Sequence, residues 1–134
     1  MKKFKKLNLQ KGDRVAAYVP NKIESIICFL ACAKNGIIWS SCSPDFGAQG
    51  VVDRFKQIEP KVFITCDYYY YNGKKINILD KVEKILKQIP SIKKVIAFNY
   101  NKQERESLKN FINFEETLKN DLDEVFERFE FNHP

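Results

Sequence analysis

Short apolar runs alternate with stretches of helical periodicity along the first three quarters of the chain. Residues 14–19, 37–42, 61–65 and 94–98 are rich in β-branched, aromatic and other apolar side chains, which predicts four strands. Apolar positions recur every three or four residues in segments 21–36, 47–58 and 77–89, which predicts three helices. Strands that alternate with helices imply right-handed βαβ crossovers. The sequence therefore predicts an α/β fold, Rossmann- or flavodoxin-like, with a mainly parallel sheet and flanking helices.

The ends of the predicted helices carry local signals. Asn21, with Glu24 three positions later, resembles an N-cap and capping box, and Gly36 is placed to end the same helix. This first helix is apolar around most of its circumference, so we expect it to be buried on most sides, packed on the sheet and covered by other parts of the domain. Asn77 is the expected cap of the third helix.

A length of 134 residues favours a single domain. Within it, residues 101–134 lose the periodic pattern and are expected to form a more loosely structured connecting segment, with a short helix from Asn113 to Leu118. Phe126, Phe129 and Phe131 stand in acidic surroundings there. An isolated chain would have difficulty covering these rings.

The net charge of +6 is unevenly distributed, because residues 1–11 carry five lysines and no acid. Nucleic-acid binding would need basic residues gathered on one face with aromatic residues between them, and most other lysines fall on polar helix positions. The longest apolar run, residues 26–33, is far shorter than the roughly 18 residues of a membrane span. Residues 1–9 also lack the apolar core of a signal peptide. We therefore expect neither nucleic acid nor membrane as a partner.

Several kinds of catalytic and metal site find no support in the sequence. The four cysteines form no CxxC pair and His133 is the only histidine, so no zinc site is expected. The motifs GxSxG, GxGxxG and GxxxxGK are absent, so neither a catalytic nucleophile nor a phosphate-binding loop is predicted. Cys28 and Cys32 lie one helical turn apart in an apolar run and are expected to be buried free thiols, which suits a reducing cytosol.

A turn follows the second predicted strand. Ser43-Pro44-Asp45-Phe46-Gly47 lies where a strand ends and a helix begins, and backbone N–H groups at such a place can hold an anion or a polar ligand. The alternative is that Ser43 or Asp45 only caps the helix. Arg54, further along that helix, is expected to form an ion pair or a contact under the turn.

Residues 68–75 (YYYYNGKK) form a second unusual stretch. Tyrosine rings could stack on an adenine base, and lysines could hold a phosphate. The alternative is a hairpin with an Asn-Gly turn and solvated lysines.

Four stretches resemble the adenylate-forming acyl-CoA synthetases. Residues 9–16 (LQKGDRVA) and 29–36 (FLACAKNG) are generic for this superfamily. Residues 38–47 (IWSSCSPDFG) and 53–62 (DRFKQIEPKV) are similar to the pattern of its acetoacetyl-CoA synthetase branch. The similarity runs to His133-Pro134 and covers nearly the whole chain, but only a small part of a family member of several domains.

The resemblance implies a two-step reaction that uses ATP, CoA and Mg²⁺. ATP and a carboxylic acid, here acetoacetate, give an acyl-adenylate and pyrophosphate, and the CoA thiol then displaces AMP. The stretch that contacts the nucleotide end of CoA in relatives, Arg-Ala-Gly-Arg, aligns with Tyr71, Asn72, Gly73 and Lys74. The turn that lies along the pantetheine aligns with Ser43, Pro44, Asp45 and Phe46. The resemblance places no catalytic residue and no metal ligand in these positions.

By this resemblance the chain is a subdomain of the larger N-terminal AMP-binding domain of a cytoplasmic acetoacetate–CoA ligase, and is inactive alone. Two alternatives stay open. One is a related synthetase for acetate or propionate. The other is a stand-alone, non-catalytic α/β binding module, which a soluble and cooperatively melting monomer would favour.

Overall fold

The computed structural model describes residues 7–102, 111–118 and 126–134. Its main sheet has five parallel strands in the order β2-β1-β3-β6-β7. The bounds are Arg14–Tyr18 for β1, Ile38–Cys42 for β2, Val62–Cys66 for β3, Lys94–Phe98 for β6 and Ile112–Asn113 for β7. The chain runs from β1 to β2 on one side and then crosses to β3 on the other, so the strand order reverses at β1. The predicted parallel α/β fold and its four strands are confirmed.

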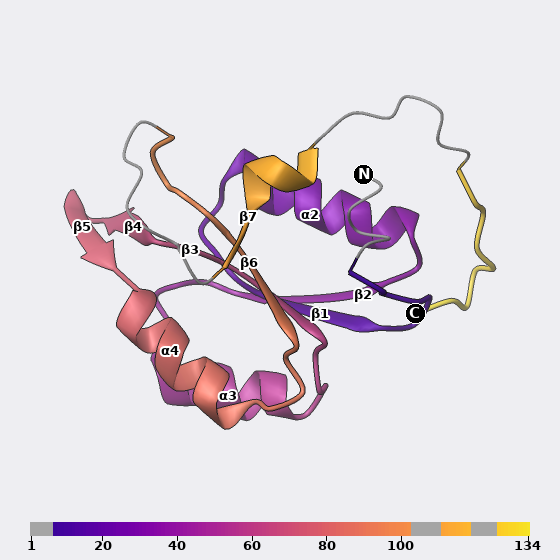
Figure 1. Cartoon of the computed structure of the whole chain (residues 1–134), viewed down its shortest axis with the longest axis horizontal. Coiled ribbons are helices and arrows are strands. Elements are labelled where there is room, and N and C mark those ends of the chain that lie inside the picture. Colours follow the sequence, from indigo (N-terminus) through magenta and orange to yellow (C-terminus); the bar gives the residue numbers. More distant parts are fainter. Residues whose placement is uncertain (1–6, 103–110, 119–125) are drawn as a thin grey trace.

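Helices cover both faces of the sheet (Figure 1). Helix α2 (Ile23–Lys34) and the short 3₁₀ helix η1 (Phe114–Leu118) lie on one face, and α3 (Ala48–Lys56) and α4 (Leu79–Gln88) lie on the other. All three predicted helices are present. The expected short helix after Asn113 is also present as η1, whose Glu115 N–H donates to the Asn113 side chain.

The central strands supply the core between these layers. Strand β3 is buried along its whole length, and the residues Val15–Tyr18 of β1 have no exposed surface. On the α3 side, Phe55 packs edge-on against Phe63, with ring centroids 6.1 Å apart. Strands covered on both faces need apolar side chains in both directions. This is why they read as continuous apolar runs in the sequence.

Helix α2 begins later than the capping-box pattern predicts. Its N-cap is Lys22, which makes no side-chain cap bond, so the prediction of Asn21 as the cap is wrong. The Lys22 N–H and the Ser25 hydroxyl both donate to the Pro20 carbonyl, at 2.9 and 2.8 Å. This turn after Pro20 delays the first helical residue and leaves Asn21 outside the helix. The other end agrees with the prediction, since Gly36 takes a φ of +63° just after the helix.

The outer face of α2 is apolar and exposed. The helix packs on the sheet as predicted, but none of the described residues covers its outer face, so the expected cover by other parts of the domain stays a prediction. The side chains that form this face are 46–60% exposed and are Ile23, Ile26, Phe29 and Leu30.

A β-hairpin follows β3 directly and projects from the sheet (Figure 1). It consists of β4 (Tyr68–Tyr71) and β5 (Lys74–Asn77), which pair antiparallel with Tyr71 opposite Lys74. Asn72 and Gly73 connect them with φ of +48° and +73°, the backbone that a two-residue type I′ turn requires. The N-cap of α4 is Ile78, which makes no side-chain cap bond, so the prediction of Asn77 as the cap is wrong. Asn77 lies one residue earlier, where its side chain accepts a bond from the Leu79 N–H at 2.9 Å.

The last described residues lie beside Gly36. The rings of Phe129 and His133 stack with centroids 4.8 Å apart, and His133 Nε2 lies 3.2 Å from the Gly36 carbonyl oxygen. Phe126 and Phe131 remain exposed, as expected for an isolated chain. The expectations for residues 103–110 and 119–125 lie outside the described residues.

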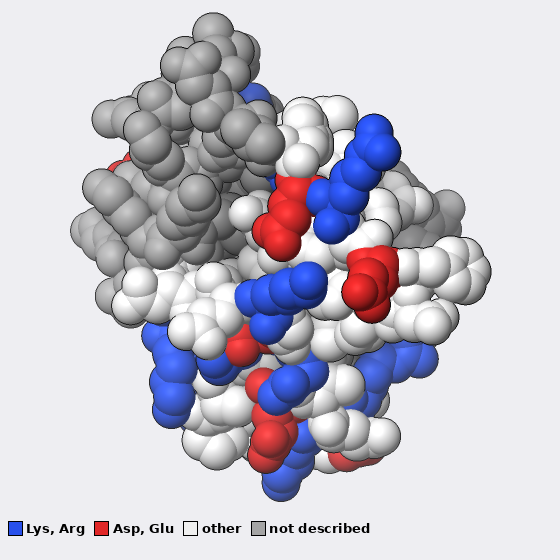
Figure 2. Space-filling model, turned by 90° about the vertical axis from the view of Figure 1, so that its right-hand side faces the viewer, with Lys and Arg blue, Asp and Glu red and all other residues white. Residues whose placement is uncertain are grey.

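Basic and acidic side chains are interspersed over the face shown in Figure 2. A nucleic-acid interface would instead gather basic residues together. In the described part of the chain, no helix is long and apolar enough to cross a membrane.

Candidate functional site

A cleft of about 390 Å³ lies at the carboxyl ends of β1 and β2. In open α/β sheets, ligands bind beyond the carboxyl ends of the strands. The loop after β1, the start of α2, the end of β2 and the hairpin strand β4 form its walls. The lining residues are Val19, Pro20, Asn21, Ser25, Ile26, Trp39, Ser41, Cys42, Ser43, Pro44, Asp45, Tyr69, Tyr70 and Tyr71.

The turn after β2 is held by its own side chains. Ser43 Oγ donates to Asp45 Oδ2 at 2.9 Å, and the Phe46 N–H donates to the Ser43 carbonyl at 3.2 Å. The N-cap of α3 is Gly47, which has no side chain to cap with. The alternative that Ser43 or Asp45 caps α3 is therefore wrong. The turn is preformed, with Asp45 exposed beside the cleft.

Tyr18 supports this turn from below. Its hydroxyl lies 2.8 Å from the Pro44 carbonyl oxygen and 2.6 Å from that of Phe46, and it can donate to either. Burial raises the pKa of Tyr18, so the hydroxyl keeps its proton at neutral pH. The sequence analysis missed this residue. The sequence did contain a signal for it: Tyr18 is the next-to-last residue of the strand segment 14–19. From that position its hydroxyl group can reach the edge of the sheet where ligands bind.

Tyr69 connects the hairpin to the turn. Burial raises the pKa of its hydroxyl to about 12, and a hydrogen bond to the Asp45 carboxylate acts in the same direction. The hydroxyl is therefore a donor at neutral pH, and Asp45 is its acceptor. Both residues line the cleft.

Half of the eight predicted site residues line the cleft. They are Ser43, Pro44, Asp45 and Tyr71. Phe46 instead lies beside Arg54, whose guanidinium carbon is 5.6 Å from the ring centroid, so the expected contact of Arg54 under the turn is confirmed. Asn72, Gly73 and Lys74 form the exposed tip of the hairpin, next to the cleft but outside its lining. The hairpin and Asn-Gly turn of the alternative interpretation are present.

All four cysteines are free and buried, which confirms the prediction made for Cys28 and Cys32. Burial raises the pKa of Cys28 and of Cys32 to about 12, and it raises that of Cys66 as well. Cys42 lines the cleft, and burial raises its pKa although the neighbouring Arg54 opposes the shift. Protonated thiols are poor nucleophiles. The cleft therefore offers a binding surface of hydroxyl groups, one carboxylate and aromatic rings.

Comparison with known proteins identifies the class to which this chain belongs. The family described as "AMP-binding enzyme" matches residues 2–125, so the chain belongs to the AMP-binding enzyme family. Acetoacetyl-CoA synthetases from several organisms are similar to it. The one from Macaca fascicularis is 37% identical over 98% of this chain, and the one from Rhizobium meliloti (strain 1021) is 59% identical over 58% of it.

The same relationship holds for a solved structure. The fold is similar to that of the acetoacetyl-CoA synthetase from Streptomyces lividans, with a TM-score of 0.91 and 36% identity over 98% of this chain. The chain spans 20% of that protein and 21% of the macaque relative. The resemblance that the sequence carries to acyl-CoA synthetases is confirmed.

Proposed function

We propose that this chain forms the CoA-binding part of an AMP-forming acetoacetate–CoA ligase. The main support for the proposal is that the Ser43–Asp45 turn and Tyr71 line the same cleft at the carboxyl ends of the strands. Similarity to acetoacetyl-CoA synthetases along nearly the whole chain supports the activity. In the proposed reaction, acetoacetate attacks the α-phosphate of ATP and releases pyrophosphate. The CoA thiol then attacks the acyl-adenylate and releases AMP.

Each wall of the cleft has a role in this proposal. The preformed turn of Ser43, Pro44 and Asp45, with Phe46 behind it, lies along the pantetheine arm. Tyr71 and the Asn72-Gly73 tip lie beside the nucleotide end of CoA. Lys74 is exposed on β5 opposite Tyr71, from which its ammonium group can reach the 3′-phosphate of CoA.

ATP and Mg²⁺ are assigned to parts of the enzyme beyond this segment. The described residues bring together no group of three or more His, Cys, Asp or Glu side chains. These residues do not fit a metal centre, so we assign none of them a role in binding Mg²⁺. We expect no ATP- and acetoacetate-dependent pyrophosphate release from the 134-residue chain alone. Four free buried cysteines support a place in the reducing cytosol.

A segment exchange tests the proposal. The matched segment of the Streptomyces lividans enzyme is replaced by this chain, and pyrophosphate release and thioester formation are measured separately. We expect both steps to proceed with acetoacetate. A hybrid that folds and releases pyrophosphate, but forms no thioester at any CoA concentration, would contradict the CoA assignment.

Lys74 offers a sharper test within the hybrid. Lys74→Ala removes a cation from the 3′-phosphate, so KM for CoA should rise about three- to tenfold, as expected for one partly exposed charge-assisted bond. The KM for dephospho-CoA should stay unchanged, because that substrate lacks the 3′-phosphate. Lys84→Ala, on the exposed side of α4, is the matched control. Equal effects on both substrates would refute the assignment.

The remaining alternatives are separated by other measurements. The preference for acetoacetate over acetate or propionate is tested by offering all three acids to the native enzyme that contains this chain. A stand-alone binding module is opposed by the exposed apolar outer face of α2. A monomeric chain that melts cooperatively and binds no CoA would favour the module.

A further inference from the structure

A buried carboxylate lies at the junction between the sheet and the hairpin. Asp67 is the single residue between the end of β3 and the start of β4, and it is 0% exposed. It is not among the residues that line the CoA cleft. Removing a carboxylate from water costs free energy unless several donors bond to it. The donors around Asp67 therefore show which parts of the chain it holds in place.

Both ends of the hairpin bond to Asp67. At the start of β4, the Tyr68 N–H donates to Asp67 Oδ1 at 2.8 Å. After the end of β5, the Ile78 N–H donates to the main-chain carbonyl of Asp67 at 3.1 Å. Asp67 thus ties both ends of the hairpin to the end of β3, and these bonds set the direction in which the hairpin leaves the sheet.

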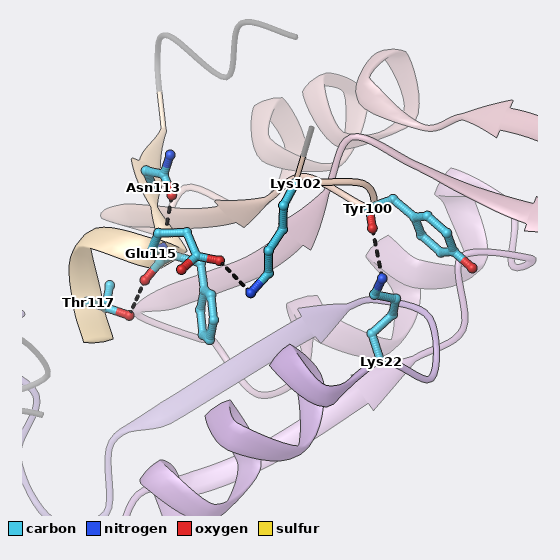
Figure 3. A network of polar contacts seen from close by, with 7 residues as sticks. Lys22, Tyr100, Lys102, Asn113, Glu115 and Thr117 are labelled. Atoms are coloured by element: carbon cyan, nitrogen blue, oxygen red, sulfur yellow. Dashed lines mark hydrogen bonds and ion pairs between the residues drawn. The ribbon is translucent and has the colours of Figure 1, made fainter. Parts of the chain in front are cut away.

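The same carboxylate binds the loop that follows β6. The Tyr100 N–H donates to Asp67 Oδ1 at 2.8 Å, and the Asn99 side-chain amide donates to Asp67 Oδ2 at 2.9 Å. The main-chain carbonyl of Tyr100 in turn accepts from Lys22 Nζ at 2.7 Å (Figure 3). Lys22 is the N-cap of α2, whose first turn also borders the cleft. The loop is therefore fixed both to the end of β3 and to the start of α2.

This loop supports the hairpin on the face that points away from the cleft. Successive side chains of a strand point to opposite faces, so Tyr68 and Tyr70 lie on one face of β4. The Tyr100 ring contacts both of them, with ring centroids 5.3 and 5.5 Å apart. Tyr69 and Tyr71 lie on the other face and line the CoA cleft, which Tyr70 also borders. The loop after β6 therefore holds the hairpin from behind.

We propose that Asp67 is a positioning residue for CoA binding. Its bonds set the place of the hairpin wall relative to the Ser43–Asp45 turn across the cleft. Asp67 touches neither CoA nor the acyl group, because it acts through the hairpin backbone and through Tyr100. A binding site depends on such support, since a wall displaced by about 1 Å no longer fits its ligand. The inference rests on the proposed CoA cleft, and it makes the affinity for CoA, but not the adenylation step, depend on this carboxylate.

Substitution of Asp67 in the hybrid enzyme tests the proposal. Asp67→Asn removes the charge and leaves one acceptor oxygen, whereas Asp67→Ala removes every side-chain acceptor. We expect KM for CoA to rise about threefold with asparagine and about tenfold with alanine, because charge-assisted bonds are lost in that order. KM for ATP and for acetoacetate, measured by pyrophosphate release, should not change. An Asp67→Asn enzyme with unchanged KM for CoA would overturn the proposal, whether or not the alanine variant folds.

Asp13→Asn is the matched control. Asp13 precedes β1, at the amino ends of the strands, where its carboxylate accepts from the Gln10 N–H at 2.8 Å and pairs with Lys61. The change also removes a bonded carboxylate, so it should lower the melting temperature but leave KM for CoA unchanged. An equal rise in KM for CoA with Asp13→Asn and Asp67→Asn would overturn the proposal, because general loss of stability would then explain both.

Hydrogen–deuterium exchange of the hybrid measures how firmly the hairpin is held. Asp67→Asn should raise the exchange rate of residues 68–78 and leave that of β1 unchanged. Unchanged exchange in the hairpin would overturn the positioning role, whatever the hybrid does with CoA.

Lys74→Ala separates a failure of this inference from a failure of the CoA assignment. If Lys74→Ala raises KM for CoA and Asp67→Asn does not, the cleft binds CoA and the positioning role of Asp67 is wrong. If neither change raises KM for CoA, the assignment of the hairpin to CoA is itself wrong.

Discussion

The two helical layers of the sheet differ in what they present to solvent. Helices α3 and α4 bury one apolar side and turn a polar side outward, where the exposed residues include Gln49, Asp53, Arg54, Lys56, Glu83, Lys84, Lys87 and Gln88. Helix α2 buries Cys28, Ala31 and Cys32, yet its outer face is also apolar. A helix that is apolar all round belongs in an interior. The outer side of α3 and α4 is polar, as expected for a surface that faces water. The outer side of α2 is apolar, as expected for a surface that another part of the protein covers.

The largest expected difference between the layers is in stability. Phe55→Ala, on the buried side of α3, should lower the free energy of unfolding by about 3–5 kcal/mol, because it removes a fully buried ring and leaves a cavity. Phe29→Ala, on the outer face of α2, should lower it by less than about 1 kcal/mol. Urea denaturation measures both. Similar losses for the two variants would mean that the outer face of α2 is covered in solution. That result would contradict the contrast drawn between the two helical layers.

A smaller effect is expected at Gly36, where α2 ends and the last residues of the chain do lie against it. A Cβ there would stand 2.9 Å from His133 Nε2 and from the Phe129 ring, at a φ of +63°. Gly36→Ala should therefore cost about 1–2 kcal/mol for the backbone plus a contribution from displacing those rings. Gly12→Ala is the matched control, since φ is +85° and no atom lies within 4 Å. If both variants lose equal stability by thermal melting, residues 129–133 do not pack there in solution.

The smallest effect on stability, with the clearest effect on association, is expected for Ile26→Lys. This change should alter the free energy of unfolding by no more than about 0.5 kcal/mol, because the side chain is exposed. It should reduce concentration-dependent self-association, since it breaks the apolar face. Analytical ultracentrifugation measures this. Gln88→Lys adds the same charge to α4 and should leave association unchanged; an equal reduction would show that net charge, and not the outer face, is responsible.

Much of the fold could be predicted from sequence because its strands are buried on both faces. Such strands leave uninterrupted apolar runs, and β1 and β3 were found for that reason. The edge strand β2 is half-buried and was found from its apolar start, Ile37 to Trp39, before a series of small polar residues. Strand β7 has only two residues and pairs with β6 across a long stretch of chain, so no local pattern marks it. The hairpin could be read only as an alternative, because four consecutive tyrosines show no alternation of polar and apolar residues.

The cleft was harder to predict than the fold. The turn at Ser43 follows β2 and Tyr71 follows β3, and both line one cleft because β2 and β3 lie on either side of β1 in the sheet. No single segment of the sequence specifies this strand order. The resemblance to acyl-CoA synthetases linked the two stretches when spacing alone could not. Tyr18 was missed because a tyrosine in an apolar run gives the same signal whether its hydroxyl is structural or faces a ligand. Tyr69 belongs to the stretch that the sequence singled out, but no local pattern could show its contact with Asp45.

The four buried cysteines can be used to measure local unfolding of the native chain. Cys28 and Cys32 lie on the buried side of α2, and Cys42 and Cys66 end β2 and β3. Burial raises the pKa of each thiol. A disulfide reagent in solution can react only when local opening exposes a thiol and lets it ionise. The rate at which each cysteine is labelled therefore reads out the opening of one strand end or one helix in the native protein, without any introduced probe.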